Sequence, residues 1–486
     1  MDGDAISFGT DGWRATLDEF TSPRVRMVGQ GVATYLCEEG FEAPVAVGYD
    51  ARESSPGFTR DLADVLTANG FDVLLPERDV PTPVVAWTIV DRDLAGACML
   101  TASHNPPEYN GVKFIPVDGA PALPDVTERI EAGLAEPNEA PEADRGEIRE
   151  VDFLGPYIEH ALAFVGLRDD GDGRNDNSDG DDEDAALANA DIDGLAGTEI
   201  AYDAMHGSGR GVTDDLLSRA GASVTRLRCD EDPTFGGTSP EPSVEKLAEL
   251  VETVRDGGAA LGIANDGDAD RIAVVTPERG YLDPNLFFAA LYDYLLETDS
   301  GPAVRSVPTT FLIDRVADAH GEPVRETPVG FKWVAQAMAE EKALVGGEES
   351  GGFGVRGHIR EKDGVLVALL AAIAERSEPF DERVSRLLDD HSEIHQDRIS
   401  LSCPDSEKAQ VLADLEGELP ETVAGEGVEE VVTIDGFKIL LESGAWILVR
   451  PSGTEPKLRV YAEAEGASRV DDLLLAGRDL VEPHVP

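Results

Sequence analysis

Basic residues are scarce in this sequence of 486 residues. Lys and Arg together number 40 against 97 Asp and Glu, which gives a formal net charge of −57 at pH 7. Nucleic-acid backbones and anionic membranes are both held by exposed Lys and Arg, so this balance argues against nucleic acid and membrane as partners. Lysine is the rarer of the two, and its eight positions are Lys113, Lys246, Lys332, Lys342, Lys362, Lys408, Lys438 and Lys457.

Cysteines and long apolar runs are scarce as well. The four cysteines are widely separated and form no CxxC pair, which argues against a disulfide framework or zinc site and fits a reducing compartment. No run of about 18 apolar residues is present to span a bilayer. The N-terminus, MDGDAISFGT, is acidic where a signal peptide would be basic. We therefore expect a cytoplasmic protein, as a monomer or small homo-oligomer.

The acidic residues are spread along the whole chain. Residues 168–184 hold nine acids and two arginines, so removing them would leave a charge of −50. This Asp/Gly/Asn-rich stretch has no periodicity, and we expect a disordered surface loop, an insertion over about 168–186. A strongly acidic surface repels itself in dilute salt, whereas at about 1 M salt the screening length falls to roughly 3 Å. The sequence is thus typical of a protein adapted to high salt.

The length and hydrophobic pattern predict several α/β domains. At roughly 100–200 residues per domain, the chain is long enough for three or four. Short apolar runs such as 45–50, 96–105 and 261–266 alternate with helical periodicity, for example over 57–69 and 243–254. This alternation is typical of largely parallel sheets. The last 90 or so residues read instead as successive strands around DG and SG turns, which indicates a smaller α+β domain.

The first of four motifs places a serine and a histidine directly after an apolar strand. Residues 101–106 read Thr-Ala-Ser-His-Asn-Pro, and in open α/β sheets ligands bind beyond the carboxyl ends of the strands. Ser103 beside His104 is compatible with a nucleophile and its base, while Ser, Asn and Pro are also common in plain turns.

Three aspartates at alternate positions follow the strand-like run 261–264. In Asn-Asp-Gly-Asp-Ala-Asp-Arg (265–271), the three carboxylates would repel each other unless a cation such as Mg²⁺ neutralised them. An EF-hand does not fit, because Arg271 stands where that loop needs Gly and Pro277 where it needs Glu. A solvated acidic turn is the competing interpretation.

Two further loops carry polar residues among glycines. Residues 346–352 read Gly-Gly-Glu-Glu-Ser-Gly-Gly, which lets the backbone approach a ligand closely and offers groups that bind sugar hydroxyls; a tight turn is the alternative. Residues 450–459 read Arg-Pro-Ser-Gly-Thr-Glu-Pro-Lys-Leu-Arg. Two arginines, two hydroxyls and a glycine within ten residues would hold a phosphate, whereas a connecting loop with rim charges is the other interpretation.

Taken in order, these four motifs resemble the α-D-phosphohexomutases, the family of phosphoglucomutases and phosphomannomutases. Weaker similarities lie at 8–14, 48–52, 109–113 and 240–242, so the resemblance covers the chain apart from the acidic insertion. It implies a four-domain α/β architecture around a central cleft, with three similar α/β domains and a C-terminal α+β domain. The implied boundaries are 1–152, 153–279, 280–393 and 394–486.

The resemblance also implies roles for individual residues. Ser103 would be the serine that is phosphorylated in the working enzyme, and its phosphate would complete the coordination of Mg²⁺. The remaining roles are implied as follows: Mg²⁺ ligands Asp266, Asp268 and Asp270; catalytic residues Arg14, His104 and Lys113; substrate-binding residues Arg271, Gly330, Lys332, Glu348, Ser350, Arg450, Ser452, Gly453, Thr454 and Arg459.

The activity that follows is that of an isomerase acting by phosphoryl transfer on a small sugar phosphate. A hexose 1-phosphate and a hexose 6-phosphate would interconvert through a hexose 1,6-bisphosphate, with Lys113 and His104 as candidates for handling the hydroxyl proton. Residues 327–333 and the triplet 348–350 favour glucose over mannose, with dual specificity open. Phosphoglucosamine mutase and a non-catalytic sugar-phosphate-binding relative are the alternatives. A phosphatase with an aspartyl nucleophile would need DxDx[TV], which residues 268–272 do not supply.

We predict that molar salt stabilises the folded protein. Screening of the surface carboxylates should raise the midpoint of thermal unfolding between about 0.1 M and about 2 M KCl. Calorimetric scans over a KCl series measure this directly. A midpoint that stays constant or falls across the series would refute salt adaptation.

Overall fold

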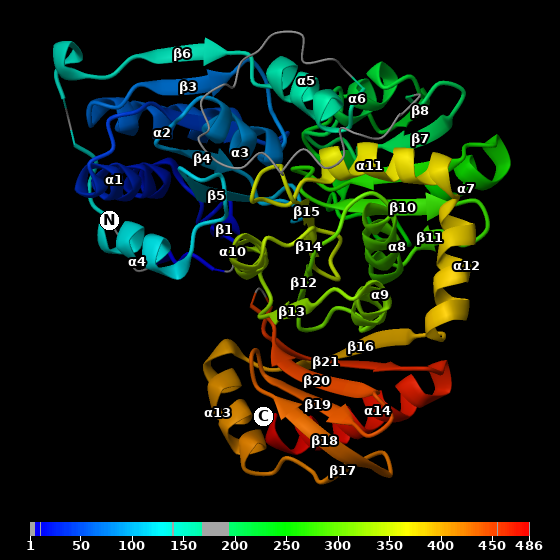
Figure 1. Ribbon diagram of the computed structural model, residues 1–486. Helices are drawn as coiled ribbons and strands as arrows, with labels where there is room; N and C mark the ends of the chain where they lie inside the picture. Colours follow the sequence, from blue (N-terminus) through cyan, green and yellow to red (C-terminus); the bar gives the residue numbers. More distant parts are fainter. Residues whose placement is uncertain (1–4, 10, 139, 168–193, 454, 486) are drawn as a thin grey trace.

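A computed structural model describes residues 5–9, 11–138, 140–167, 194–453 and 455–485. The expected acidic insertion at 168–186 and the candidate residue Thr454 lie outside these described residues. No helix in the described ranges is both long and apolar enough to cross a bilayer. The chain builds four sheets, each with its own helices (Figure 1).

The first sheet has six strands in the order β1-β5-β4-β2-β3-β6. Its strands are β1 (Trp13–Thr16), β2 (Val45–Tyr49), β3 (Val73–Pro76), β4 (Gly96–Leu100), β5 (Tyr109–Pro116) and β6 (Ile148–Val151). Its helices are α1 (Ser22–Glu39), α2 (Ser55–Ala68), α3 (Thr82–Asp91) and α4 (Pro124–Ala132).

Both faces of the central strands of this sheet are buried. Val45 and Val47 of β2 pack in one apolar cluster with α1 and α2, while Ala46 between them joins a second cluster with α3. The alternation follows from the strand period of two, and it makes a three-layer α/β/α arrangement. This explains why the run 45–49 is apolar throughout rather than alternating.

The second and third sheets repeat the central pattern of the first. The second has the order β11-β10-β9-β7-β8 and the third β13-β12-β14-β15. Their strands are β7 (Glu199–Asp203), β8 (Ser223–Leu227), β9 (Leu261–Asn265), β10 (Ile272–Thr276), β11 (Gly280–Leu282), β12 (Ala303–Ser306), β13 (Val324–Thr327), β14 (Val345–Gly347) and β15 (Phe353–Val355).

Each of these three sheets contains three neighbouring parallel strands. A further strand pairs antiparallel with whichever of the three comes last in the sequence. The third parallel strand is β4, β9 or β14, and a short loop joins it to β5, β10 or β15. The expectation of three similar α/β domains is confirmed by this shared topology.

Helices cover the second and third sheets and also join them. They are α5 (Leu154–Phe164), α6 (Thr213–Arg219), α7 (Ala248–Gly257), α8 (Pro284–Leu296), α9 (Leu312–His320), α10 (Phe331–Glu341), α11 (Gly364–Ser377) and α12 (Phe380–His391). Helix α7 begins at Ala248, five residues after the expected start at 243. Helix α11 is apolar on almost every side and lies against β9, β10 and α6 of the second sheet (Figure 1).

The last sheet is antiparallel throughout, in the order β16-β21-β20-β19-β18-β17. Its elements are β16 (His395–Ser402), α13 (Asp405–Glu416), β17 (Thr422–Val423), β18 (Glu426–Val432), β19 (Phe437–Leu441), β20 (Trp446–Pro451), β21 (Lys457–Ala464) and α14 (Ala467–Val481). A small apolar cluster around Val307, Trp446 and Tyr461 packs this sheet against the third. The expected C-terminal α+β domain is thus confirmed.

A group of hydrogen-bonded polar side chains lies where elements of the first three sheets meet. The Tyr157 hydroxyl donates to Asp363 Oδ2 over 2.6 Å, and His358 Nε2 lies 2.8 Å from the same oxygen. The other nitrogen of His358 lies 3.0 Å from Nε2 of His160, whose ring packs on Trp87. Helix α5 and the loop before α11 therefore share one hydrogen-bonded group, which packs on Trp87 of α3.

We predict that acid destabilises the protein through His160. Burial and the neighbouring His358 lower the pKa of His160 from 6.5 to about 4, against a smaller opposing effect of Asp363. The unfolded chain therefore binds more protons between these values, and stability should fall by up to about 3 kcal/mol as pH drops from 6.5 towards 4. Urea unfolding at several pH values measures the slope. The His160→Gln variant, which keeps a donor for His358, should show a shallower slope, and equal slopes would contradict the assignment.

Candidate active site

The three loops that follow β4, β9 and β14 carry three of the four sequence motifs. We call residues 101–106 the serine loop, 265–271 the aspartate loop and 346–352 the glutamate loop. Each stands at the carboxyl end of a parallel strand, where open α/β sheets place their ligands. The fold therefore repeats one functional position three times.

Ser103 is held in an unusual backbone conformation. Its φ of 49° lies in the left-handed region, which side-chain-bearing residues adopt at a cost. Its amide donates to the Thr101 hydroxyl over 2.7 Å. The fully buried Arg52 donates to the carbonyls of Ser103 and Asn105, and also to those of Pro106 and Tyr109. One arginine thus fixes the whole turn.

The Ser103 hydroxyl points at the aspartate loop. Its Oγ donates to Asp266 Oδ2 over 2.8 Å, and it lies 3.3 Å from Nδ1 of His104. A Cβ on Gly267 would stand 2.6 Å from the Ser103 carbonyl oxygen, so only glycine allows the two loops to approach this closely. The nucleophile-and-base interpretation of the Ser-His pair is therefore compatible with the geometry.

The three aspartates form one fully buried group. Carboxylate oxygens of Asp266, Asp268 and Asp270 all lie within 4.8 Å of one another. Burial and the other two carboxylates raise the pKa of Asp266 well above its usual range. Burial alone would raise the pKa of Asp268 too, but Lys113 and the Thr82 hydroxyl outweigh it and hold that pKa low.

Two buried lysines from other elements offset this negative charge. Lys113 Nζ on β5 lies 2.7 Å from Asp11, 3.1 Å from Asp270 and 3.3 Å from Asp268. Lys362, just before α11, lies 3.0 Å from Asp270 and 3.1 Å from Glu361. Burial would lower the pKa of both lysines, but these carboxylates outweigh it and raise it.

The residues present fit a divalent cation. One oxygen of Asp268 and one of Asp270 are enclosed yet accept no hydrogen bond within the described part of the chain. Unpartnered buried carboxylate oxygens are costly, and hard oxygen donors are what Mg²⁺ binds. A solvated acidic turn is therefore excluded, because all three side chains are buried.

Cationic groups border the same cluster. Arg14 lies 3.3 Å from Asp11 and 3.5 Å from Asn105, and Arg271 Nε lies 3.9 Å from Asp270. The Nε atoms of both arginines are enclosed and make no hydrogen bond to any described residue. Burial, Arg271 and Arg14 together lower the pKa of His104 well below its usual value. The site thus combines a neutral histidine with unsatisfied cationic donors, which suits an anionic substrate.

The glutamate loop adjoins the aspartate loop. Ile272 at the start of β10 donates its amide to the Gly351 carbonyl over 2.9 Å. Glu348 is buried and accepts from the Gly330 amide over 2.8 Å, which ties it to the start of α10 beside Lys332. Burial and Glu349 raise the pKa of Glu348. Ser350 is exposed at the tip of the loop.

The fourth motif, residues 450–459, stands apart on the last sheet. Arg450 and Arg459 occupy opposite positions on β20 and β21, so two like charges face each other. Asp435 pairs with Arg450 and Glu455 with Arg459, both at 2.9 Å. The Ser452 hydroxyl is buried without a hydrogen-bond partner among the described residues, and Gly453 beside it is exposed. This loop therefore offers a second cluster of donors for an anion.

Several residues at these sites were not singled out in the sequence. Lys362, Glu361 and Asp11 complete the charge balance of the aspartates, and burial raises the pKa of Glu361 to about 7 against the neighbouring Lys362. Lys408 on α13 donates to the carbonyls of Ser452 and Glu455 over 2.6 Å and so shapes the fourth motif's loop. The scarcity of lysine was the available signal, because Lys113, Lys362, Lys408 and Lys438 are all buried.

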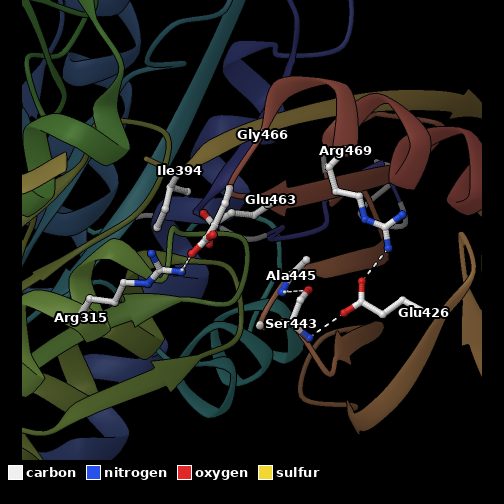
Figure 2. Close-up of a pocket in the computed structure, with 11 residues that line it drawn as sticks. Arg315, Ile394, Glu426, Ser443, Ala445, Glu463, Gly466 and Arg469 are labelled. Carbon is white, nitrogen blue, oxygen red and sulfur yellow. Dashed lines mark hydrogen bonds and ion pairs between the residues drawn. The ribbon is translucent and has the colours of Figure 1, made fainter. Parts of the chain in front are cut away.

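A cavity and a second acidic group are less suited to catalysis than these two sites. A cavity of about 230 Å³ lies between the third and fourth sheets (Figure 2). Its arginines are already paired, Arg315 with Glu465 and Arg469 with Glu426. A second acidic group, Asp293, Glu297 and Glu378, is neutralised by Arg383 and Arg386.

Comparisons with known proteins agree with this architecture. Four family models match: phosphoglucomutase/phosphomannomutase domain I at residues 5–140, domain II at 185–280, domain III at 283–392 and the C-terminal domain at 399–478. A solved structure from Thermus thermophilus, described as a phosphomannomutase, superposes with a TM-score of 0.80 at 30% identity, covering 98% of this chain and 99% of that one.

Curated relatives are similar over nearly the whole chain. A Methanopyrus kandleri protein named "Probable phosphoglucosamine mutase" is 33% identical over 472 residues, 96% of this chain and 95% of that protein. A phosphopentomutase of Thermococcus kodakarensis is also 33% identical, covering 96% and 95%. A phosphoglucomutase/phosphomannomutase of the same organism is 30% identical and covers 98% of both chains.

The fold and the comparisons define a four-domain mutase of the isomerase class. The chain belongs to the phosphoglucomutase/phosphomannomutase family, as the four motifs had indicated.

We predict that Arg52 is required to hold the serine loop. In the wild type, Arg52 Nε lies 2.9 Å from the buried carboxylate of Asp50. The Arg52→Met change removes this cation and also removes the donor to four carbonyls. Removing one partner of a buried ion pair costs about 3–5 kcal/mol of unfolding free energy. Chemical denaturation measures this loss.

The double variant Arg52→Met/Asp50→Asn serves as the control, because it also removes the stranded charge. It should recover part of the lost stability. A loss of less than about 1 kcal/mol in the single variant would contradict this role for Arg52.

Proposed function

We propose that the protein interconverts hexose 1-phosphate and hexose 6-phosphate through a phosphoserine at Ser103 and a hexose 1,6-bisphosphate. The observation that carries this proposal is the 2.8 Å contact between Ser103 Oγ and the buried aspartate group. A hydroxyl placed against carboxylates, lysines and arginines suits the transfer of a highly charged phosphoryl group.

The contacts of each group support the roles that we assign. In the forward step, the bond between phosphorus and Ser103 Oγ breaks while a bond to the free sugar hydroxyl forms. The sugar hydroxyl gives up its proton as this bond forms, and the departing Ser103 Oγ takes one up. We assign both proton transfers to His104, whose Nδ1 lies 3.3 Å from Ser103 Oγ. Lys113 is less suited to accept the sugar proton, because three carboxylates surround its ammonium group. Arg14, Arg271 and Lys113 orient the transferred group.

The bisphosphate then reverses its orientation and returns its other phosphoryl group to Ser103. Throughout, one phosphate is not reacting, and Arg450, Ser452, Gly453, Thr454 and Arg459 are the residues we assign to it. Glu348, Ser350, Gly330 and Lys332 would bind the sugar between the two phosphates. The contacts from Ile272 to Gly351 and from Glu348 to Gly330 support this order of subsites.

Asp266, Asp268 and Asp270, together with the serine phosphate, would hold Mg²⁺. When bound, Mg²⁺ polarises the transferring phosphoryl group and offsets its charge. The chain prepares for it by keeping the two unpartnered oxygens of Asp268 and Asp270 enclosed. Thr82 and Lys113 fix the remaining oxygen of Asp268.

We propose glucose as the preferred sugar, with mannose as a second substrate. The sequences 327–333 and 348–350 support this choice. Where many relatives have a histidine after Gly351, this chain has Gly352, and a Cβ there would stand 2.8 Å from Lys362 Cδ. Lys362 thus fills the space that a larger side chain at 352 would need. The names of the curated relatives keep glucosamine as the main alternative.

We predict one phosphate on the purified protein, carried by Ser103. Intact mass should show a phosphorylated species that the Ser103→Ala variant lacks, and the Ser385→Ala control on α12 should retain it. Glucose 1-phosphate with Mg²⁺ and a trace of glucose 1,6-bisphosphate should yield glucose 6-phosphate with wild type and the control only. Full turnover by Ser103→Ala would sink the proposal.

We predict that kcat/KM is highest for glucose 1-phosphate. Side-by-side kinetics with glucose, mannose and glucosamine 1-phosphates at molar KCl test this order. The three sugars differ in the groups that Glu348 and its neighbours would bind, so a hydrogen-bonding difference should be worth about tenfold or more. A preference for glucosamine 1-phosphate would replace the assignment with phosphoglucosamine mutase.

A further inference from the structure

One carboxylate on the last sheet touches both the phosphate arginine and the third sheet. Asp435 Oδ2 accepts from Arg450 Nε over 2.9 Å and from the amide of Val329 over 3.1 Å. Asp435 lies in the turn before β19, whereas Val329 lies in the segment between β13 and α10. Both hydrogen bonds meet at one oxygen, and the one from Val329 crosses between the two sheets.

The turn that carries Asp435 is fixed against Arg450. Gly436 has a φ of 85°, and a Cβ on it would stand 2.2 Å from the Val449 carbonyl oxygen and 3.0 Å from Arg450 Cβ. No larger residue fits in this turn without displacing β20. The position of Asp435 is thus set by backbone contact as well as by its ion pair.

Asp435 engages Arg450 at one edge only. Among the described residues, Nε is the single guanidinium donor of Arg450 with a hydrogen-bond acceptor, and neither Nη atom has a partner there. The side chain is only 7% exposed, and its cross-strand neighbour is a second arginine. An acceptor at Nε that leaves both Nη donors unengaged orients the guanidinium for an anion.

The same link continues into the sugar-binding side. The next amide along the chain, that of Gly330, donates to Glu348, and Phe331 then begins α10. Val329 also packs its side chain on the apolar cluster around Trp446. A continuous series of contacts therefore runs from Arg450 through Asp435 and residues 329–330 to Glu348.

We propose that Asp435 is a positioning residue that fixes Arg450 relative to the loop that holds Glu348. It sets the spacing between the site for the non-reacting phosphate and the site for the sugar ring. This inference rests on the proposed function, in which Arg450 binds that phosphate in every step. Because the phosphate is held equally in the ground state and the transition state, loss of Asp435 should weaken binding more than turnover.

Kinetics of Asp435→Ala and Asp435→Asn in the full chain provide the first test. One charge-assisted hydrogen bond is worth about 1.5–3 kcal/mol, so KM for glucose 1-phosphate should rise roughly tenfold to hundredfold in Asp435→Ala. The change in kcat should stay within about threefold. Asp435→Asn preserves size and an acceptor for Val329, and its KM should rise less.

Gln396→Ala is the matched control. Gln396 on β16 also makes two hydrogen bonds to the third domain, to the Pro308 carbonyl and from Asn285, but touches neither Arg450 nor Val329. Its KM should match wild type. Equal rises in KM for Asp435→Ala and Gln396→Ala would show that only the packing between the sheets matters and would overturn the proposal, as would an unchanged KM in both Asp435 variants.

Binding without turnover separates this proposal from the proposed function. Calorimetry of glucose 6-phosphate on the Ser103→Ala background should give a Kd at least about tenfold weaker when Asp435→Ala is added. If Asp435→Ala weakens the binding of glucose 6-phosphate but wild type does not interconvert hexose phosphates, the positioning role stands and the proposed mutase activity fails. If wild type interconverts hexose phosphates but Asp435→Ala leaves the Kd unchanged, the mutase activity stands and the positioning role fails.

Discussion

The burial of three aspartates against two lysines is the constraint on which the rest of the structure depends. Asp266, Asp268 and Asp270 lie with Lys113 and Lys362 in a region closed to solvent, and the partly exposed Asp11 lies at its edge. Stripping charges of water costs several kcal/mol each unless partners replace it. These partners come from β5, the aspartate loop and the segment before α11, so the carboxylates and the lysines meet only when three domains are assembled.

This requirement explains features that look unrelated. Helix α11 packs on the second sheet, and a Cβ on Gly364 at its start would stand 2.4 Å from the Arg271 carbonyl oxygen. That close approach delivers Lys362 to Asp270. On the other side, Arg52 fixes the serine loop so that Ser103 faces Asp266. The same loop position in three similar sheets thus contributes the Ser103 hydroxyl, the aspartate group and the buried carboxylate of Glu348.

Much of this was predictable from the sequence, because the information is local. The alternation of apolar strands and helices indicated the α/β class, and polar residues directly after apolar strands indicated the three loops. The resemblance supplied their order and roles. The contacts of Lys362 and Asp435 were not predictable in this way. Lys362 precedes an ordinary apolar helix and Asp435 precedes a turn glycine, and their partners lie far away in the sequence and at unrelated positions.

The structure shows where lysines lie in a chain whose net charge is −57. Four of the eight lysines are buried: Lys113 and Lys362 lie against the aspartates, Lys408 shapes the loop of the fourth motif, and Lys438 donates to Val307 and Glu326 between the last two sheets. Burial and Arg305 lower the pKa of Lys438 to about 8, against the opposing effect of Glu326. These buried lysines contact carboxylates or backbone carbonyls and are therefore not part of the acidic surface.

The most direct test of the central claim follows the phosphoryl group through the first turnover. Enzyme labelled with radioactive phosphate at Ser103 is mixed with glucose 1-phosphate and Mg²⁺ and quenched on the millisecond scale. The account predicts that label leaves Ser103 and appears in glucose 1,6-bisphosphate before any glucose 6-phosphate accumulates. Formation of glucose 6-phosphate while the label stays on Ser103 would contradict it.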